Sequence, residues 1–335
     1  MNHSLFTKKN ININIFLGFV FIFSLAGFFY VNRSVGADTP TYIKIFNQCL
    51  DVNREFFELE PGFWFLNRII RFITSEYKIL FFLMYLFVTI YTCKSIYTFR
   101  YQFSIIFSVI VYFSLFFLQS LSLARIYMAT SFVLISTVYL YKNEKIKSLI
   151  FLLIGCSLHY SCLIMFFPWF AYVLRFNRKL YILFFLAIVF FVYGGFLTLV
   201  LELFPRYKIY LDLIGVSDRV GIMFYLKSLP LAFLLFQVKD SFAKKEFNFF
   251  FYYISFLIFI YFMSYIFIPI GRAWVHFEFV YIIFIPLALE KLRYTKFYRY
   301  RKLEVLFFYC LIFFMCLIYI VSYKQSDQLF NQTVF

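Results

Sequence analysis

The first candidates for chemistry are ionisable side chains within or at the edges of long apolar runs, because such groups are costly at membrane depth. Arginine can bind an anion there, and a carboxylate or an imidazole can take up or release a proton. Arg125 and Arg272 each begin an apolar run after a short turn, and Asp38 follows the first apolar run. The ionisable residues of the apolar runs are Arg125, His159, Lys227, Arg272, His276 and Glu278.

Each candidate also has a purely structural explanation. An arginine at a helix end often anchors that helix at the membrane interface. His159 can be a hydrogen-bonded interior histidine, and Asp38 can cap the helix that Pro40 starts. Glu60 can belong to a simple turn at Glu60-Pro61-Gly62. Taken one at a time, these residues do not distinguish a functional site from a structural role.

The composition narrows the class of protein in which these residues act. Of 335 residues, 64% are hydrophobic, 26% are aromatic and only 14% are charged. A soluble domain is roughly half apolar and about one-quarter charged. The composition therefore excludes a water-soluble enzyme, a disordered chain and a disulfide scaffold, and it predicts an all-α polytopic membrane protein.

The positive charge predicts membrane topology rather than a nucleic-acid partner. The net charge is +16, and in a soluble protein this would suggest nucleic acid. Here lysine and arginine gather in short loops between apolar runs, as they do in cytoplasmic loops of membrane proteins. We therefore expect a cytoplasmic amino terminus and no nucleic-acid partner. The loop richest in basic residues, 291–302, carries Lys291, Arg293, Lys296, Arg299, Arg301 and Lys302.

Apolar runs long enough to cross the bilayer predict about eleven membrane segments in a single domain, 1–335. The run at 146–174 is ambiguous, and a hairpin of two short helices turning near 156–161 keeps loop 291–302 in the cytoplasm. The carboxyl end then lies outside. The other predicted segments are 13–31, 78–98, 103–121, 124–141, 180–201, 220–238, 247–268, 273–290 and 303–322.

The largest polar insertion, residues 32–77, lies on the outer side in this topology. Two stripes of apolar residues at helical spacing, separated by Glu60-Pro61-Gly62, predict helices that lie in the plane of the membrane interface. The stripes are Tyr42, Ile43, Phe46 and Leu50, and then Phe63, Leu66, Ile69, Ile70 and Ile73.

The six cysteines form no C-x-x-C pair in the sequence, so we expect neither a metal site nor a disulfide framework. We expect no cofactor, although the carboxylates of the outer loop leave a divalent metal open.

The order of the short motifs resembles that of the EpsG-like group of bacterial O-antigen and exopolysaccharide polymerases, often called Wzy. The resemblance covers nearly the whole chain except the tail from Tyr323. It rests on Asp38-x-x-x-Tyr42, Glu60-Pro61-Gly62-Phe63 with Leu66 and Asn67, Arg125, His159-Tyr160-Ser161, Arg206-Tyr207 with Tyr210, and Arg272.

The resemblance implies a glycosyltransferase that joins oligosaccharide units carried on undecaprenyl diphosphate, at the outer face of the bacterial cytoplasmic (inner) membrane. The growing chain leaves its lipid carrier and is attached to the next lipid-linked unit. Implied partners are this lipid-linked oligosaccharide, the lipid bilayer, and membrane proteins that regulate chain length or flip the lipid-linked units.

Such a site needs a base near the acceptor hydroxyl and cations for the departing diphosphate. The resemblance implies Asp38 as the favoured base, with His159 as its rival or as a diphosphate ligand. The residues implied in substrate binding are Arg125, Arg272, Arg206, Glu60 and Tyr207.

Other functions stay open at this point. A different membrane glycosyltransferase with a polyprenyl-linked donor, or an O-antigen ligase, would need similar residues. A transporter for the lipid-linked units is a further alternative, but transporters often show two related halves. The sequence has no such internal repeat, and its polar residues gather at one face.

Overall fold

The computed structural model describes residues 13–32, 38–50, 60–176, 180, 183, 185–186, 222–264, 273–293 and 313. Within these residues the secondary structure is helical and contains no strand. The chain divides into two compact units, Met1–Tyr160 with Phe279–Phe335, and Ser161–Glu278.

The first unit contains most of the described helices. Helices α5 and α6 are joined by a π-helical turn, Phe113–Phe117, so that they form one apolar rod. The helices are α1 (Ile13–Val31), α2 (Thr39–Gln48), α3 (Pro61–Ile73), α4 (Lys78–Thr98), α5 (Ile105–Tyr112), α6 (Leu118–Ser122), α7 (Ala124–Tyr141), α8 (Lys145–Leu158) and α15 (Tyr281–Arg293).

Helix α7 is the core of this unit and packs against α4 on one side and α8 on the other. Small residues allow the close approach, since a Cβ on Gly155 of α8 would lie 3.2 Å from the carbonyl oxygen of Ala129. The hydroxyl of Ser136 donates to the carbonyl of Ser148 at 2.7 Å and so joins α7 to α8. The first turn of α7, which carries Arg125, therefore belongs to a tightly packed helix.

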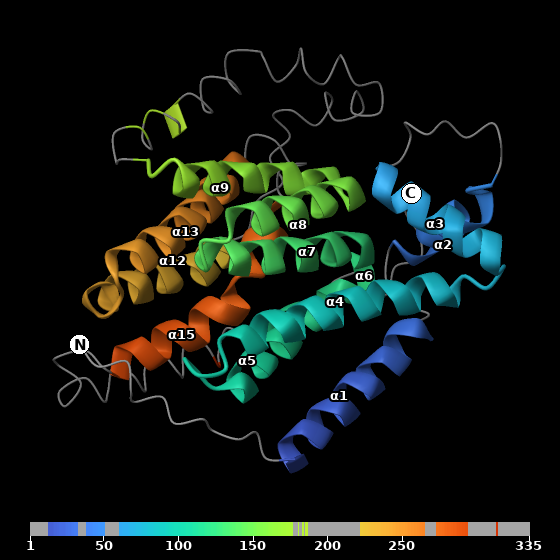
Figure 1. The fold of residues 1–335 in the computed structure, drawn as a ribbon, viewed down its shortest axis with the longest axis horizontal. Coiled ribbons are helices and arrows are strands. Elements are labelled where there is room, and N and C mark those ends of the chain that lie inside the picture. The colour runs from blue at the N-terminus through green and yellow to red at the C-terminus, as the bar shows by residue number, and fades with distance from the viewer. Residues whose placement is uncertain are drawn as a thin grey trace. The chain divides into compact units, whose positions relative to one another are not determined.

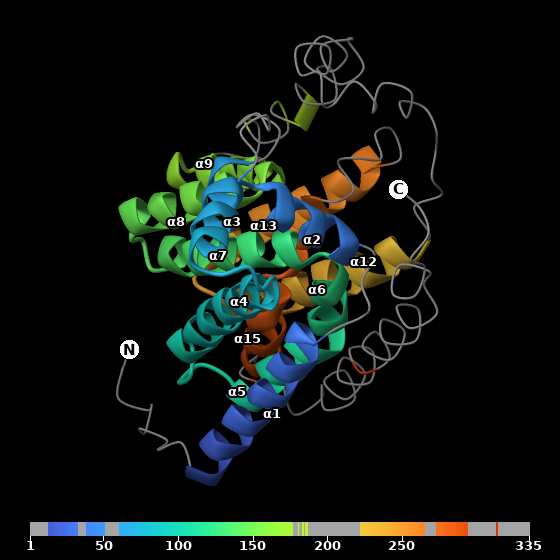
Figure 2. The same ribbon diagram turned by 90° about the vertical axis from the view of Figure 1, so that its right-hand side faces the viewer.

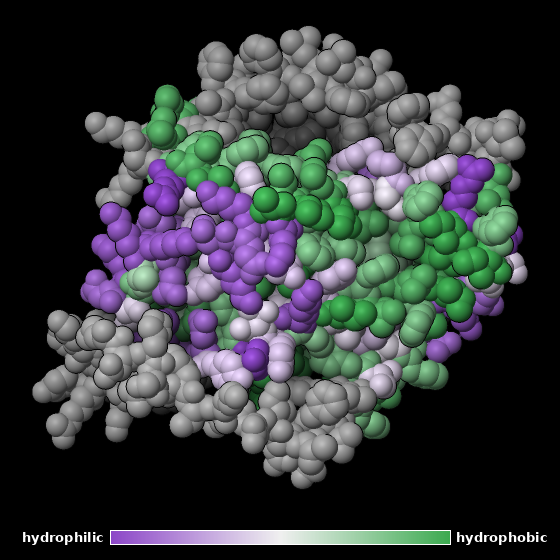
Figure 3. Space-filling model, in the orientation of Figure 1, coloured by the Kyte–Doolittle hydropathy of each residue, from purple (hydrophilic) through white to green (hydrophobic). Residues whose placement is uncertain are grey.

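Helices α2 and α3 lie across one end of α4, α7 and α8, as both ribbon views show (Figures 1 and 2). At that end α4 and α7 begin and α8 finishes. The opposite end carries the basic loop residues and is covered by hydrophilic surface in Figure 3. The positive-inside rule predicts that this basic end faces the cytoplasm and that α2 and α3 lie on the outer side, so we name the end that they cover the outer end. The basic residues there are Lys94, Arg100, Lys142, Lys145 and Lys147.

In the described part of the chain, four helices are long and apolar enough to cross a membrane: Lys78–Thr98, Ile105–Ser122, Ala124–Tyr141 and Lys244–Met263. The predicted segments at 13–31, 78–98 and 124–141 coincide with α1, α4 and α7. Most of the segments predicted at 180–201 and 303–322, and most of the basic loop 291–302, lie outside the described residues. The total of about eleven segments stays a prediction.

The ambiguous run at 146–174 is broken, as predicted. Helix α8 ends at Leu158, His159 is extended with φ −156° and ψ 120°, and a 3-10 turn, Tyr160–Met165, leads into α9 (Phe166–Val173). The arms belong to different units, so the hairpin itself stays a prediction.

The single helix predicted at 273–290 is wrong, because the chain forms α14 (Trp274–Glu278), a turn, and then α15. At the turn, the ring of Phe279 packs at 5.1 Å from Phe116 and 5.6 Å from Tyr127. We attribute the break to this packing, which outweighs local helix propensity.

The second unit contains α9, α12 (Ile222–Gln237), α13 (Lys244–Ser264) and α14. Helix α13 packs against the other three. Its contacts are largely aromatic, as in the ring pairs of Tyr172 with Phe249 at 5.2 Å and of Phe256 with Phe277 at 6.4 Å.

Apart from Arg68, the exposed residues of α3 are apolar, although the helix is too short to cross a bilayer. It has 13 residues, and its buried residues are Phe63, Asn67 and Ile70 rather than the whole predicted stripe. On the other side Phe72 is 85% exposed and Ile73 76% exposed, and Figure 3 shows hydrophobic surface where α3 lies. This two-sided pattern suits a helix that rests on protein with one face and in lipid with the other.

We therefore expect Trp64 to lie at headgroup depth. The chain has three tryptophans, so a Trp169→Phe/Trp274→Phe variant reports on Trp64 alone. In bilayers, lipids brominated near the headgroup should quench its fluorescence more than lipids brominated near the chain ends. Stronger quenching by the lipids brominated near the chain ends, or no quenching by either kind, would contradict an interfacial α3.

Candidate functional site

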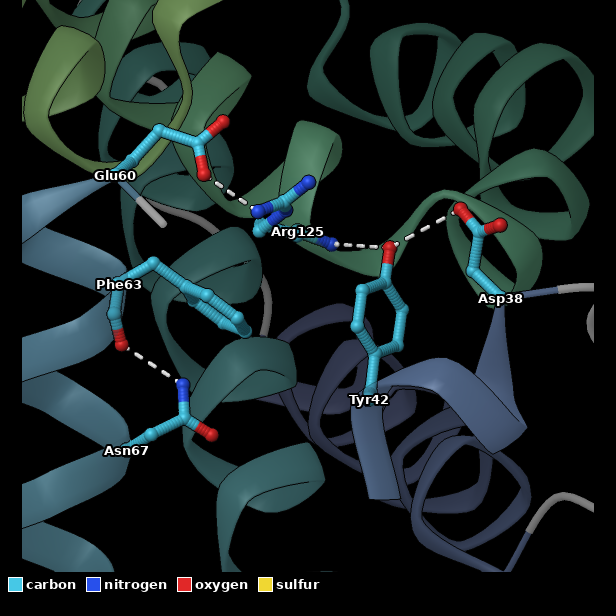
Figure 4. Close-up of polar contacts among 6 residues, drawn as sticks. All are labelled: Asp38, Tyr42, Glu60, Phe63, Asn67 and Arg125. Carbon is cyan, nitrogen blue, oxygen red and sulfur yellow. Dashed lines mark hydrogen bonds and ion pairs between the residues drawn. The ribbon is translucent and has the colours of Figure 1, made fainter. Parts of the chain in front are cut away.

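An ion pair between Arg125 and Glu60 forms the centre of the outer end of the first unit (Figure 4). The Nη1 atom of Arg125 lies 2.5 Å from Oε2 of Glu60, and the side chains are only 15% and 4% exposed. Arg125 belongs to the first turn of α7, and Glu60 immediately precedes α3. The pair therefore fastens the start of α3 to the start of α7.

The local sequence at Glu60 explains why its carboxylate reaches Arg125. Pro61 takes the first helical position, for which its fixed φ is suited. Glu60 is extended, with φ −62° and ψ 132°, and its carboxylate makes no capping hydrogen bond to α3. Its carbonyl accepts the first helical hydrogen bond, from the N–H of Trp64 at 2.9 Å. The carboxylate is thus directed away from its own helix.

Tyr42 connects Asp38 to the same place. Its hydroxyl donates to Oδ2 of Asp38 at 3.3 Å and accepts the backbone N–H of Arg125 at 3.4 Å. The first N–H groups of a helix have no partner within it, so Tyr42 satisfies one of them at the start of α7. Asp38 occupies the N-cap position of α2, but its carboxylate makes no cap hydrogen bond. Asp38, Glu60 and Arg125 therefore share one polar network.

The ring of Phe63 shields the guanidinium from solvent. The Cζ atom of Arg125 lies 5.2 Å from the centroid of this ring, and Phe63 is itself fully buried. Phe63 also meets Tyr42 edge-on at 6.2 Å. A cation held over an aromatic face in a dry setting is bound more strongly than one in water. The Nε atom of Arg125 is buried without a hydrogen-bond partner among the described residues, so one edge of the guanidinium is uncommitted.

The last turn of α8, which His159 follows directly, packs against the first turn of α3. A Cβ on Gly62 would lie 2.4 Å from Oγ of Ser157 and 2.8 Å from its carbonyl oxygen. Only glycine allows this approach, and His159 follows two residues after Ser157. Of the predicted site residues, Asp38, Glu60 and Arg125 form one network, and α8 brings His159 to the same end of the unit.

The remaining predicted site residues, Arg206, Tyr207 and Arg272, lie outside the described residues. In the described ranges, no group of three or more His, Cys, Asp or Glu side chains is placed to hold a metal ion.

The second unit contains a contact that the sequence did not reveal. Oγ of Ser161 lies 2.7 Å from Nε2 of His276, and Sγ of Cys162 lies 3.7 Å from Nδ1 of the same ring. Nearby in sequence, Glu278 accepts a hydrogen bond from the hydroxyl of Tyr261. The sequence marked His276 and Glu278 as buried ionisable groups, but their partners are far away along the chain. Ser161 was visible only as the last residue of the His159-Tyr160-Ser161 motif.

Gly62→Ala should separate α3 from α8, because the added Cβ meets both a side chain and a backbone oxygen. We expect a loss of about 1–3 kcal/mol in the free energy of unfolding, measured by thermal unfolding in detergent. The double variant Gly62→Ala/Ser157→Ala should recover only part of the loss, since the clash with the carbonyl remains. Full recovery would show that the backbones are not in close contact.

Glu60→Gln and Arg125→Gln should each destabilise the protein by about 3 kcal/mol, because each leaves a buried charge without its partner. The double variant should lose less than the sum of the two, and the difference measures the coupling. Additive losses in unfolding experiments would contradict a direct ion pair.

A comparison with known protein families gives a match over nearly the whole chain. Residues 14–334 match the model of the EpsG family. No curated protein and no solved structure matches the chain. The match includes the segments that carry Asp38, Glu60, Arg125 and His159. The chain is therefore a member of the EpsG family.

Proposed function

We propose that this protein is a polysaccharide polymerase that joins oligosaccharide units carried on undecaprenyl diphosphate at the outer face of the bacterial cytoplasmic membrane. Membership of the EpsG family supports a polymerase-like function in polysaccharide biosynthesis. The observation that carries the proposal is the partly buried Arg125, held by Glu60 where α2 and α3 cover the outer end of the helices.

The electrostatics around Arg125 favour an anion. The first turns of α3 and α7 meet here, and each helix start carries a partial positive charge. A cation in the first turn of α7 opposes that dipole, so its position has a cost that Glu60 offsets. Glu60 uses Nη1, and the uncommitted Nε edge can bind a phosphate oxygen. A diphosphate leaving group develops the kind of charge that this arrangement stabilises.

The reaction then needs one base. In the proposed step, Asp38 takes the proton of the acceptor hydroxyl, and the oxygen of that hydroxyl forms a bond to the anomeric carbon of the donor. The bond from that carbon to the diphosphate oxygen breaks, and the electron pair leaves with the diphosphate. Because the diphosphate departs as an anion, no acid is needed. His159, at the end of α8, is the alternative base.

The rest of the proposal follows the family resemblance. Arg272 and Arg206 supply further positive charge to the diphosphate, and Tyr207 contacts substrate. The donor and acceptor are both lipid-linked oligosaccharides within the bilayer. A flippase that delivers the units and a chain-length regulator are the proposed membrane partners.

Arg125→Lys should separate phosphate binding from stability. Lysine keeps the charge opposite Glu60, but it loses the planar fork that binds two phosphate oxygens. In liposomes with the native lipid-linked unit, we expect chain extension to fall about tenfold to a hundredfold while thermal stability changes little. Arg100→Lys, a matched change at the opposite end of α4, should extend chains normally.

Two results would contradict the proposal. Full activity of Arg125→Lys would remove Arg125 from diphosphate binding, and no extension by the unaltered protein would reject the polymerase.

Surface polysaccharide from a deletion strain distinguishes the related enzymes, since loss of a polymerase keeps single-unit product and loss of a ligase removes all attached units. Movement of the lipid-linked unit across the liposome without extension would indicate a transporter.

A further inference from the structure

Two polar atoms on the buried face of α3 have no hydrogen-bond partner among the described residues: Oδ1 of Asn67 and Nε of Arg71. Asn67 is fully buried, and its Nδ2 group donates to the carbonyl of Phe63 at 2.8 Å, which leaves the amide oxygen unused. The Cζ atom of Arg71 lies 5.8 Å from the ring centroid of Phe46 in α2. One acceptor and one donor are therefore buried and unsatisfied.

The two atoms lie on the same side of the helix. Residues four apart are neighbours on a helix surface, with Cβ atoms about 5–6 Å apart. The contacts of α3 with α2, Phe63 with Tyr42 and Arg71 with Phe46, fall one turn before and one turn after Asn67. In Figure 4 the amide oxygen of Asn67 points away from α3, on the side from which the Phe63 ring projects.

Unsatisfied buried polar atoms are expensive and uncommon in native proteins, so each needs an explanation. A leucine at position 67 would have nearly the same shape as asparagine and would leave no acceptor unpaired. Asparagine therefore costs stability at this position in the ligand-free protein. Such costs are typical of residues that are kept for binding.

We infer that Asn67 and Arg71 form a saccharide subsite, an inference that rests on the proposed function. A hydroxyl group donates and accepts, so it satisfies both atoms, either alone or as two neighbouring hydroxyls of a sugar ring. An anion would pair with Arg71 but would place a second acceptor against Oδ1 of Asn67. A cation would have the opposite conflict. The pair thus selects an uncharged polyol.

The position of the subsite fits a substrate whose diphosphate lies at Arg125. Asn67 is seven residues beyond Glu60, which is about 10 Å along the helix. The sugar next to the diphosphate would thus lie along α3, with its hydroxyls near Asn67 and Arg71. Because Asn67 is fully buried, we expect binding of the sugar to require a displacement of the helices packed against α3, which are α2, α4 and α8.

Asn67→Leu distinguishes this subsite from a structural role. We expect Tm in detergent to stay the same or rise, and the KM for the lipid-linked unit to rise about tenfold. Asn47→Leu, on the exposed face of α2, is the control and should change neither value. If Tm falls and KM is unchanged, a buried water rather than a sugar occupies the place, and the inference is wrong.

A binding measurement keeps this inference separate from the polymerase itself. The probe is the repeat-unit oligosaccharide released from the lipid-linked fraction of a deletion strain. It should raise Tm of the unaltered protein but not of Asn67→Leu, whereas inorganic diphosphate should raise Tm of both. An equal shift by the oligosaccharide in both proteins overturns the subsite, whether or not the protein extends chains.

Arg71→Lys tests the second atom, because lysine keeps the charge and removes Nε. Arg71→Lys should reduce the rise in Tm that the oligosaccharide causes. The matched change Arg68→Lys, on the exposed face of α3 above Trp64, should leave this rise unaltered. An unaltered shift in Arg71→Lys would remove Arg71 from the subsite.

Discussion

The ion pair of Glu60 with Arg125 is the constraint on which the outer end of the first unit depends. In a setting of low dielectric neither charge is tolerable alone, because removing one leaves the other desolvated and unpaired. The pair therefore fixes where α3 begins. That position in turn explains the glycine at 62, which faces Ser157 of α8, and the burial of Phe63 beneath the guanidinium.

The same pair gives the site its electrostatic character. Arg125 stands where the dipole of α7 disfavours a cation, and Glu60 stands where the dipole of α3 favours an anion. Glu60 holds the guanidinium in one orientation but uses only Nη1. For the proposed phosphate contact, a rigid and partly uncommitted arginine is better prepared than a mobile one, because its ordering is complete before the substrate arrives.

The buried face of α3 shows a conflict between stability and binding. A helix that served only to cover the bundle would bury apolar side chains alone, such as Phe63 and Ile70. Asn67 and Arg71 interrupt that face with polar atoms for which the described part of the chain supplies no hydrogen-bond partner. Alternation of apolar side chains with the two groups of the proposed subsite suits a substrate that is itself part apolar and part polyol.

The sequence alone determined the membrane class and the ends of α1, α4 and α7, because hydropathy acts locally. For the ambiguous run at 146–174, the positive-inside charge bias favoured a break near His159 over a single helix. It also marked Asp38, Glu60 and Arg125 as candidates from their residue types and motifs. Only the tertiary structure decided that Glu60 pairs with Arg125, 65 residues away, that Ser161 meets His276, and which face of α3 is buried. These depend on how helices pack, and a local pattern of apolar residues is compatible with several packings.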